Sequence, residues 1–292
     1  MSDHAKETIL VTGATGNTGR AAASVLAARG FTVRAAARKP ERLAQTPGVE
    51  AVAFDYRNPS TWDAALQGVS GVFLVAPPMD PEAPAKLTPF IDGAKAAGVG
   101  KAVFVSAYGV DQSEDNPLRL IERHLLASGM EVTLLRPNFF MENFSGGFAA
   151  PMIRSNNAIF LAAGEAKTSF VACADIADAA AAAFAGGHAG KAYTLTGPEA
   201  LDHAEVAEII GGARGLSVTY YPLPEKQMLD GARGMGMPEG SVQYLAFLYQ
   251  MVRAGHMAEV TGDVEAVTGR KPTSFKAFAQ ANATAWTPED DD

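Results

Sequence analysis

The chain has 292 residues, of which 48% are hydrophobic and 19% are charged, as in an ordinary globular protein. Its formal net charge is −8 and it has no basic stripe, which argues against a nucleic-acid partner. Cys173 is the single cysteine, so an internal disulfide is excluded and we expect no bound metal. No stretch resembles a signal peptide or a membrane span, so we expect a cytoplasmic protein without a membrane partner.

A glycine-rich turn follows the first apolar run, residues 8–10. Residues 11–20 read VTGATGNTGR, with three glycines at the spacing G-x-x-G-x-x-G. One glycine permits a tight turn, one lets the backbone approach a pyrophosphate, and one lets the next helix pack close to the strand. Free N–H groups at that helix's start favour phosphate binding. We therefore predict a dinucleotide site, with a ligand-free glycine turn as the alternative. Its residues are Gly13, Thr15, Gly16, Asn17, Thr18 and Gly19.

Short β-rich runs alternate with helical patterns from residue 7 to about 137. The predicted strands are 7–12, 31–36, 49–54, 71–76, 101–106 and 131–136, and the predicted helices are 17–29, 59–67, 83–97 and 117–128. Several strands are almost wholly apolar, which is typical of a parallel sheet covered by helices on both faces. The predicted fold class is α/β, with a doubly wound parallel Rossmann sheet in an NAD(P)-binding domain over residues 1–140.

The pattern changes after Pro137, and residues 141–292 are predicted to form a smaller α+β substrate lobe sharing the same core. Its expected elements are a helix over 141–157 broken at Gly146-Gly147, short strands around Gly164, a helix at about 174–185, a strand at 193–196, a helix from Asp202 to Gly211, and a strand with further helices over 217–281. Asp202 is a helix cap because its carboxylate accepts N–H groups of the first turn.

The end of the second strand distinguishes NADPH from NADH. An acid there binds the ribose 2′-hydroxyl of NAD, whereas a base accommodates the 2′-phosphate of NADP. Arg38 and Lys39 stand there with no acid before Glu41, so NADPH is favoured; a solvated basic turn is the alternative. Further contacts are expected from Asp55 (to the adenine amino group) and Tyr56 after the third strand, and from Ala76, Pro77 and Pro78 after the fourth.

Catalytic residues of the usual kind are missing. Many dehydrogenases of this fold use a Tyr with a Lys four residues later to protonate a carbonyl as hydride arrives. No tyrosine here has that partner. Ser106 stands at the end of the fifth strand as a candidate catalytic or cofactor-binding residue, and Tyr108 is the candidate proton donor or substrate anchor. Hydride transfer can proceed without a strong acid when the acceptor is an iminium ion, a cationic dye or a quinone.

Four segments resemble the NmrA-like, atypical branch of the short-chain dehydrogenase/reductase superfamily, over nearly the whole chain. They are VTGATG at 11–16, the turn at Asp55, LLRPNFFMENF at 134–144 and FVACADIA at 170–177. Within that branch the chain is similar to festuclavine-dehydrogenase-like proteins of the ergot-alkaloid type, and to triphenylmethane and quinone reductases. The resemblance implies an NAD(P)H-dependent reductase of iminium, quinone or similar electrophiles.

The resemblance also implies site residues. It places Pro137, Asn138 and Phe139 against the nicotinamide, and an apolar substrate wall at Phe140, Met141, Asn143 and Phe144. Core packing between the lobes is the alternative for these aromatic side chains. Leu118 stands where many relatives carry His or Lys, which further disfavours acid catalysis.

Two functions fit these features. The first is a reductase acting on a small organic molecule, and the second is a nucleotide-binding redox sensor without turnover. The apolar segment 138–144 favours the reductase, since a sensor needs no such pocket. By analogy with related folds, helices 83–97 and 117–128 are expected to form the interface of a homodimer.

Overall fold

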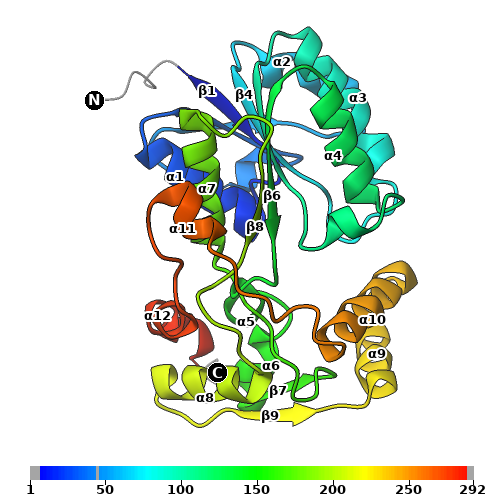
Figure 1. The fold of residues 1–292 in the computed structure, drawn as a ribbon, viewed down its shortest axis with the longest axis vertical. Coiled ribbons are helices and arrows are strands. Elements are labelled where there is room, and N and C mark those ends of the chain that lie inside the picture. Colours follow the sequence, from blue (N-terminus) through cyan, green and yellow to red (C-terminus); the bar gives the residue numbers. More distant parts are fainter. Residues whose placement is uncertain (1–6, 44–45, 288–292) are drawn as a thin grey trace. The chain divides into compact units, whose positions relative to one another are not determined.

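The structure is a computed structural model that describes residues 7–43 and 46–287. The chain divides into two compact units (Figure 1). The first draws on Met1–Pro137, Cys173–Leu195 and Asp263–Arg270, and the second on Asn138–Ala172, Thr196–Gly262 and Lys271–Asp292. The predicted division was a single boundary at residue 140. In the structure the first unit also takes in two later segments, because a strand and two helices after residue 140 complete its sheet and cover it.

A seven-stranded parallel sheet lies at the centre of the first unit, in the order β3-β2-β1-β4-β5-β6-β8. Its strands are β1 Thr8–Val11, β2 Thr32–Ala37, β3 Val49–Ala53, β4 Gly71–Val75, β5 Lys101–Val105, β6 Glu131–Pro137 and β8 Ala192–Leu195. The order reverses between β2 and β4, both neighbours of β1, where Val11 pairs with Ala35 and Phe73. Ligands of doubly wound sheets bind at such a switch point, beyond the carboxyl ends of the strands. The predicted Rossmann architecture is confirmed.

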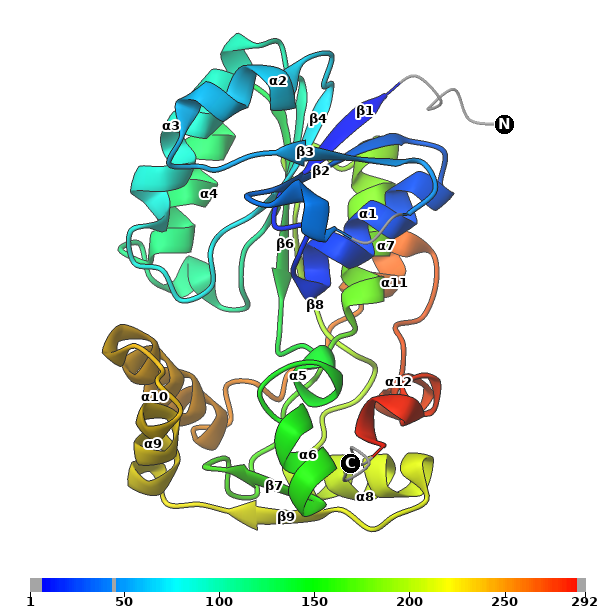
Figure 2. The same cartoon turned by 180° about the vertical axis from the view of Figure 1, so that it is seen from behind.

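Helices cover both faces of this sheet (Figures 1 and 2). One face carries α1 Asn17–Ala28, α7 Cys173–Ala185 and α11 Asp263–Thr268, and the other carries α2 Trp62–Leu66, α3 Ala83–Ala96 and α4 Pro117–Ala127. Short 3-10 turns lie at Pro40–Arg42, Pro59–Thr61 and Val110–Gln112. The helix predicted at 59–67 is therefore split into a 3-10 turn and the short α2. Asn58 caps the turn, its Oδ1 accepting from the Ser60 N–H.

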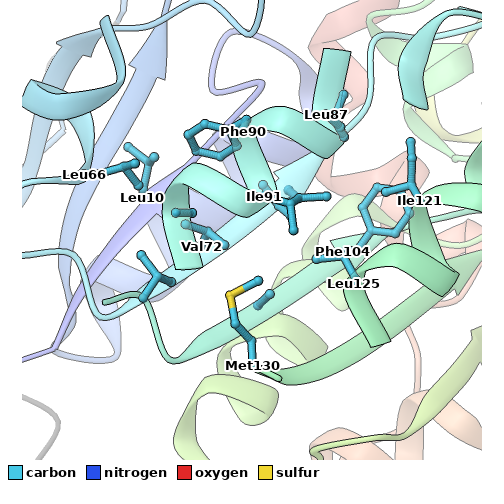
Figure 3. Packing of buried hydrophobic residues seen from close by; sticks show 14 of the residues in the cluster. Leu10, Leu66, Val72, Leu87, Phe90, Ile91, Phe104, Ile121, Leu125 and Met130 are labelled. Atoms are coloured by element: carbon cyan, nitrogen blue, oxygen red, sulfur yellow. The ribbon is translucent and has the colours of Figure 1, made fainter. Parts of the chain in front are cut away.

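An apolar cluster joins the sheet to α3 and α4 (Figure 3). Leu87, Phe90, Ile91 and Ala94 recur at helical spacing along one face of α3, and all four are buried. They pack against strand residues such as Val72 and Phe104. Burying each large side chain contributes about 1.5–3 kcal/mol, so this cluster stabilises the packing of α3 and α4 on the sheet.

The second unit is mainly helical. It contains α5 Glu142–Ser145, α6 Ala150–Asn156, α8 His203–Arg214, α9 Glu225–Gly234, α10 Glu239–Arg253, α12 Phe275–Ala281, a 3-10 turn at Ala283–Trp286, and the parallel strands β7 Ala158–Leu161 and β9 Thr219–Pro222. The break at Gly146-Gly147 is confirmed. After Gly164, in place of a strand, Thr168 and Val171 each form an isolated bridge, because each pairs with a different segment.

The Asp202 cap is also confirmed. Its Oδ1 accepts from the N–H groups of Ala204 and Glu205, both at 2.8 Å. The helix continues past Gly211 to Arg214 and ends at Gly215, whose φ is +75°. Gly211 does not end the helix; a Cβ there would lie 3.1 Å from the Val218 nitrogen, so this glycine permits close packing.

Within residues 7–43 and 46–287, none of the helices has the length and apolar character needed to cross a membrane. The same residues contain no cluster of three His, Cys, Asp or Glu side chains able to hold a metal ion.

Candidate functional site

The glycine turn between β1 and α1 is built around the carbonyl oxygen of Gly13. Gly13 has a φ of +63°, which favours glycine, and its oxygen accepts from the Gly16 N–H at 2.9 Å. A Cβ on Gly13 would lie 3.2 Å from the Val75 Cβ, and one on Gly19 would lie 2.3 Å from the Gly13 oxygen. Gly16 then caps α1 in extended conformation with no side-chain cap bond. The turn is tight because Gly13 and Gly19 carry no side chain at the two points of close approach.

The six residues predicted in this turn fall into two groups. Gly13, Thr15 and Gly16 are exposed and Asn17 is half-buried, so these four face outward, where a ligand can reach them. Thr18 and Gly19 are buried, and Thr18 Oγ1 lies 3.7 Å from Cys173 Sγ at the start of α7. The sequence motif does not separate the two roles. In the structure, the last two residues hold α1 against its neighbours.

Two exposed cations, Arg38 and Lys39, follow β2 directly. Arg34 belongs to the same basic stretch but has another role: its Nη1 donates to the carbonyl oxygens of Ala64, Ala65 and Gln67, at 3.3, 3.0 and 2.8 Å. These carbonyls end α2, where a cation is favoured by the helix dipole. Arg34 is thus bonded within the fold, whereas Arg38 and Lys39 stay exposed at this strand end, where a phosphate can reach them.

Tyr56, after β3, joins the strands at the switch point. Its hydroxyl donates to Thr12 Oγ1 at 2.9 Å; that oxygen also accepts from the Val75 N–H at 2.9 Å and donates to the Phe73 oxygen at 3.0 Å. Burial raises the pKa of Tyr56 well above its ordinary value, so the phenol stays neutral. Asp55 beside it is half-buried and accepts from the Arg57 N–H at 2.9 Å. The Tyr56 hydroxyl therefore ties the segment after β3 to β1 and β4 at the switch point.

The turn after β4 contains the predicted Ala76, Pro77 and Pro78. Ala76 and Pro77 are half-buried and Pro78 is exposed. Asp80 then fixes the turn, because its Oδ1 accepts from the Glu82 N–H at 3.0 Å and its carboxylate pairs with Lys86. The turn offers apolar surface at the carboxyl end of β4.

Ser106 and Tyr108 follow β5 and are tied to β6. The Ser106 N–H donates to the Leu135 oxygen at 2.8 Å, and the Tyr108 N–H donates to the Pro137 oxygen at 3.0 Å. Ser106 is 6% exposed, and its buried Oγ has no hydrogen-bond partner among the residues that the structure describes. An unpaired buried hydroxyl costs about 1–3 kcal/mol, so this atom suits a polar group of a ligand. Tyr108 is half-buried.

In the second unit, Asn138 clamps three segments of the chain. Its Nδ2 donates to Ser169 Oγ at 2.8 Å and to the Met257 oxygen at 2.9 Å, and its Oδ1 accepts from the Phe139 N–H at 2.9 Å. Asn138 and Ser169 are buried. The polar atoms of this side chain are thus occupied within the unit, and a ligand contact would use its backbone or its neighbours. Neither Ser169 nor Met257 stands in a sequence pattern that predicts this role.

The proposed substrate wall is only partly at the surface. Met141 and Phe144 are buried in the second unit, whereas Phe139, Phe140 and Asn143 are half-buried. Phe144 packs among aromatic rings and its carbonyl oxygen accepts from Trp286 Nε1 at 2.5 Å. Core packing therefore accounts for Met141 and Phe144, and contact with an acceptor stays a prediction for Phe140 and Asn143.

His203, to which the sequence analysis assigns no role, lies in this aromatic cluster. Its ring centre is 5.4 Å from that of Tyr220, 5.7 Å from Phe170 and 5.9 Å from Phe144. Burial lowers the pKa of His203 to about 4, so the imidazole is neutral at neutral pH. A histidine beside the helix cap gave no sequence signal that it would be buried.

A hollow in the first unit lies away from these residues. It encloses about 440 Å³ and is lined by Asp63, Ala64, Leu66, Gln67, Gly68 and Ala97. Gly68 and Ala97 precede β4 and β5, so the hollow lies at the amino ends of the strands. It takes no part in the site at the carboxyl ends.

Three features suit a dinucleotide: the glycine turn between β1 and α1 at the switch point, the cations Arg38 and Lys39 after β2, and the Ser106 hydroxyl after β5. Together with the sheet order they define a Rossmann-type dinucleotide-binding protein. The chain belongs to the NmrA-like family, whose pattern matches residues 5–281. This agrees with the resemblance inferred from the sequence.

Curated relatives match almost end to end. The chain is 36% identical to the uncharacterized oxidoreductase YesF of Bacillus subtilis over 96% of each chain. It is 34% identical to the NAD(P)H azoreductase of Xenophilus azovorans, over 95% of this chain and 99% of the relative. It is 33% identical to the agroclavine dehydrogenase of Claviceps fusiformis, over 97% of this chain and 100% of the relative.

Solved structures agree with the fold. The NADPH complex of the NADPH-dependent quinone oxidoreductase QOR2 of Escherichia coli is 27% identical, with a TM-score of 0.79 over 94% of this chain and 99% of that chain. Triphenylmethane reductase of Citrobacter sp. is 23% identical, with a TM-score of 0.81 over 95% of this chain and 99% of that chain, and supports the fold alone.

Proposed function

We propose that this NAD(P)H-dependent oxidoreductase transfers hydride from NADPH to an iminium, quinone or similar electrophilic acceptor without a Tyr-Lys catalytic pair. The observation that carries the proposal is the edge after β5. There the buried Ser106 hydroxyl has no partner within residues 7–43 and 46–287, and Tyr108 is followed four residues later by Gln112 rather than Lys. The edge offers a polar contact for a cofactor but no ammonium group to acidify the tyrosine.

The residues that would hold the cofactor follow from the strand ends. The outward-facing Gly13, Thr15, Gly16 and Asn17 suit the pyrophosphate, and Arg38 with Lys39 suits the 2′-phosphate. Asp55 suits the adenine, and Ser106 offers its hydroxyl to a polar group of the nicotinamide end. When bound, NADPH supplies the hydride.

The acceptor class follows from the proton balance. An iminium carbon that takes hydride becomes an amine and needs no proton in that step. A quinone that takes hydride needs one proton to become a hydroquinone, and water can deliver it after the charge has been delocalised over the ring. Neither reaction needs a strongly acidic side chain, which matches the residues present. The names of the azo, agroclavine and quinone enzymes similar to this chain support the same range.

The test is oxidation of NADPH, followed by its absorbance, with a panel of quinones, cyclic iminium ions, azo compounds and triphenylmethane dyes, and with NADH in parallel. We expect turnover with at least one class and a preference for NADPH. Tight NADPH binding without turnover across the panel would instead support the redox-sensor function and remove the reductase proposal.

The homodimer expected through α3 and α4 stays a prediction. Leu120 and Leu126 on α4 are 43% and 46% exposed, which gives that surface an apolar component. Light scattering of the purified protein tests it: a mass of one chain, 30.5 kDa, would contradict the dimer.

A further inference from the structure

A carboxylate is buried between α4 and β6 in the first unit. Glu122 has no solvent exposure, and Arg136 of β6 binds it through two parallel bonds. Arg136 Nε donates to Oε1 at 2.9 Å and Nη2 donates to Oε2 at 2.8 Å. Arg119 also donates to Oε2, at 3.0 Å. This paired geometry fixes the plane of the Arg136 guanidinium, and the bonds to Glu122 raise its pKa.

The remaining nitrogen of Arg136 reaches into the loop that follows β5. Its Nη1 donates to Asp111 Oδ2 at 2.6 Å, and Asp111 lies in the 3-10 turn Val110–Gln112. At the other end of the loop, the amides of Ser106 and Tyr108 donate to β6. The segment from Ser106 to Asp111 is thus fastened to the end of β6 at both of its ends.

This arrangement is poorly explained by stability alone. Removing two charges from water costs about as much as their attraction returns, and well-packed apolar residues often replace such a pair without loss. What an Arg fork adds is orientation, because its five N–H groups lie in one plane at fixed angles. Here the guanidinium of Arg136, on β6, binds both Glu122 on α4 and Asp111 in the loop that carries Ser106, and so fixes the positions of these three segments.

We propose that Arg136 and Asp111 are positioning residues of the site. Their ion pair holds the loop 106–111 in the conformation that presents the Ser106 hydroxyl and Tyr108 at the carboxyl edge of the sheet. The hydrogen bonds of Asp111, Ser106 and Tyr108 to β6 hold the loop whatever the protein does. Only the effect of the loop on turnover rests on the proposed function.

The loop offers a matched control in Glu114. Glu114 belongs to the same connection between β5 and α4, and its exposed carboxylate pairs with Arg119 and Arg123, at 3.2 and 3.1 Å. It does not contact Arg136 among the described residues. Asp111→Ala therefore removes the fastening, whereas Glu114→Gln removes the ion pairs of another exposed carboxylate in the same connection. Asp111→Asn keeps an oxygen acceptor for Arg136 without the charge.

The first measurement is hydrogen exchange of the peptide covering residues 106–112 in the full-length protein, without and with NADPH. We expect Asp111→Ala to exchange at least tenfold faster than wild type without NADPH, Asp111→Asn to lie between, and Glu114→Gln to match wild type. We also expect NADPH to protect this peptide in wild type and not in Asp111→Ala. Unchanged exchange in Asp111→Ala overturns the proposal.

The second measurement is kinetic and uses an acceptor that wild type reduces. Asp111→Ala should lower kcat at least fivefold and raise the dissociation constant of NADPH by a smaller factor, because the phosphate contacts lie elsewhere and only the contact of Ser106 with the nicotinamide end is disturbed. Wild-type kcat in a variant whose loop exchanges fast overturns the role in positioning. If wild type turns over no acceptor, the proposed function fails, and the NADPH protection in the exchange experiment still decides the proposal.

Discussion

A Cβ on Gly19 would lie 2.3 Å from the carbonyl oxygen of Gly13, and the same atom on Gly16 would lie 3.4 Å from it. Real Cβ atoms do not approach backbone to 2.3 Å, so Gly19 is required for the close approach of α1 to the turn. Gly16 has an allowed conformation, and its space is ordinary van der Waals contact. Gly19 is therefore needed for folding, whereas neither the conformation nor the surroundings of Gly16 require a glycine, and we propose that Gly16 is needed for the ligand.

Gly19→Ala is predicted to destabilise the protein by about 1–3 kcal/mol, since an overpacked site must displace backbone. Gly16→Ala is the matched variant: it should melt near the wild-type temperature but weaken NADPH binding by at least tenfold, because its methyl group occupies the exposed side of the turn. Thermal melting and a fluorescence titration with NADPH measure the two effects. Normal NADPH affinity in Gly16→Ala would contradict the placement of the pyrophosphate.

Arg38→Ala is predicted to raise the dissociation constant of NADPH by roughly tenfold to a hundredfold while leaving that of NADH unchanged. A charge-assisted hydrogen bond to a phosphate contributes about 1.5–3 kcal/mol, and NADH has no 2′-phosphate to lose. Arg42→Ala is the control, because Arg42 is also an exposed cation but follows four residues later, in the 3-10 turn. Equal losses for NADPH and NADH would show that Arg38 does not contact the 2′-phosphate.

The Ser106→Ala variant tests whether the Ser106 hydroxyl contacts a ligand or stabilises the fold. The Oγ atom is buried without a partner, so its removal should leave the free protein as stable as wild type or up to about 1 kcal/mol more stable. The same change should weaken NADPH binding or lower kcat severalfold. Calorimetry of the free protein and of its NADPH complex gives both values. A variant that is destabilised when free would mean that Ser106 serves the fold.

The burial of His203 predicts that the protein loses stability in acid. Its folded pKa of about 4 lies below the value of 6.5 that an exposed imidazole has. Below pH 6.5 the unfolded chain binds a proton at this histidine that the folded chain does not bind. The contribution of the neutral imidazole to the free energy of unfolding is therefore present above pH 6.5 and is lost as the pH falls toward 4. By linkage the loss is about 2 kcal/mol between pH 7.5 and pH 5.

The measurement is urea unfolding of wild type and of His203→Gln across that pH range. Gln does not titrate in this range. The free energy of unfolding of the variant, although lower overall, should therefore fall by about 2 kcal/mol less than that of wild type between pH 7.5 and pH 5. An identical slope in both proteins means that His203 is protonated without cost and is not enclosed as described.

Glu122→Gln is predicted to cost about 3–5 kcal/mol, because it leaves the partly buried Arg136 and Arg119 without their shared carboxylate. Glu114→Gln should cost less than about 1 kcal/mol, since its ion pairs are exposed and screened by solvent. Chemical unfolding measures both. Similar small losses would show that the charge of Glu122 contributes little to the fold.

Local sequence determined the framework of the first unit. The alternation of apolar runs with helical patterns predicted its strands and most of its helices, because burial on both faces of a parallel sheet leaves a continuous apolar signal. The glycine spacing and the bases after the second strand predicted where a dinucleotide would bind. These features depend on residues within a few positions of one another, and so does the Asp202 cap.

Tertiary structure decided which of these residues are exposed and which are buried. Thr18 and Gly19 stand in the same motif as Gly16, yet they are buried, and the polar atoms of Asn138 are bonded to Ser169 and Met257, far along the chain. No pattern in the sequence predicted the ion pair between Arg136 and Glu122, because it forms only when α4 packs beside β6. Local patterns record propensity and periodicity, whereas burial and hydrogen-bond partners depend on which distant segments the chain brings together.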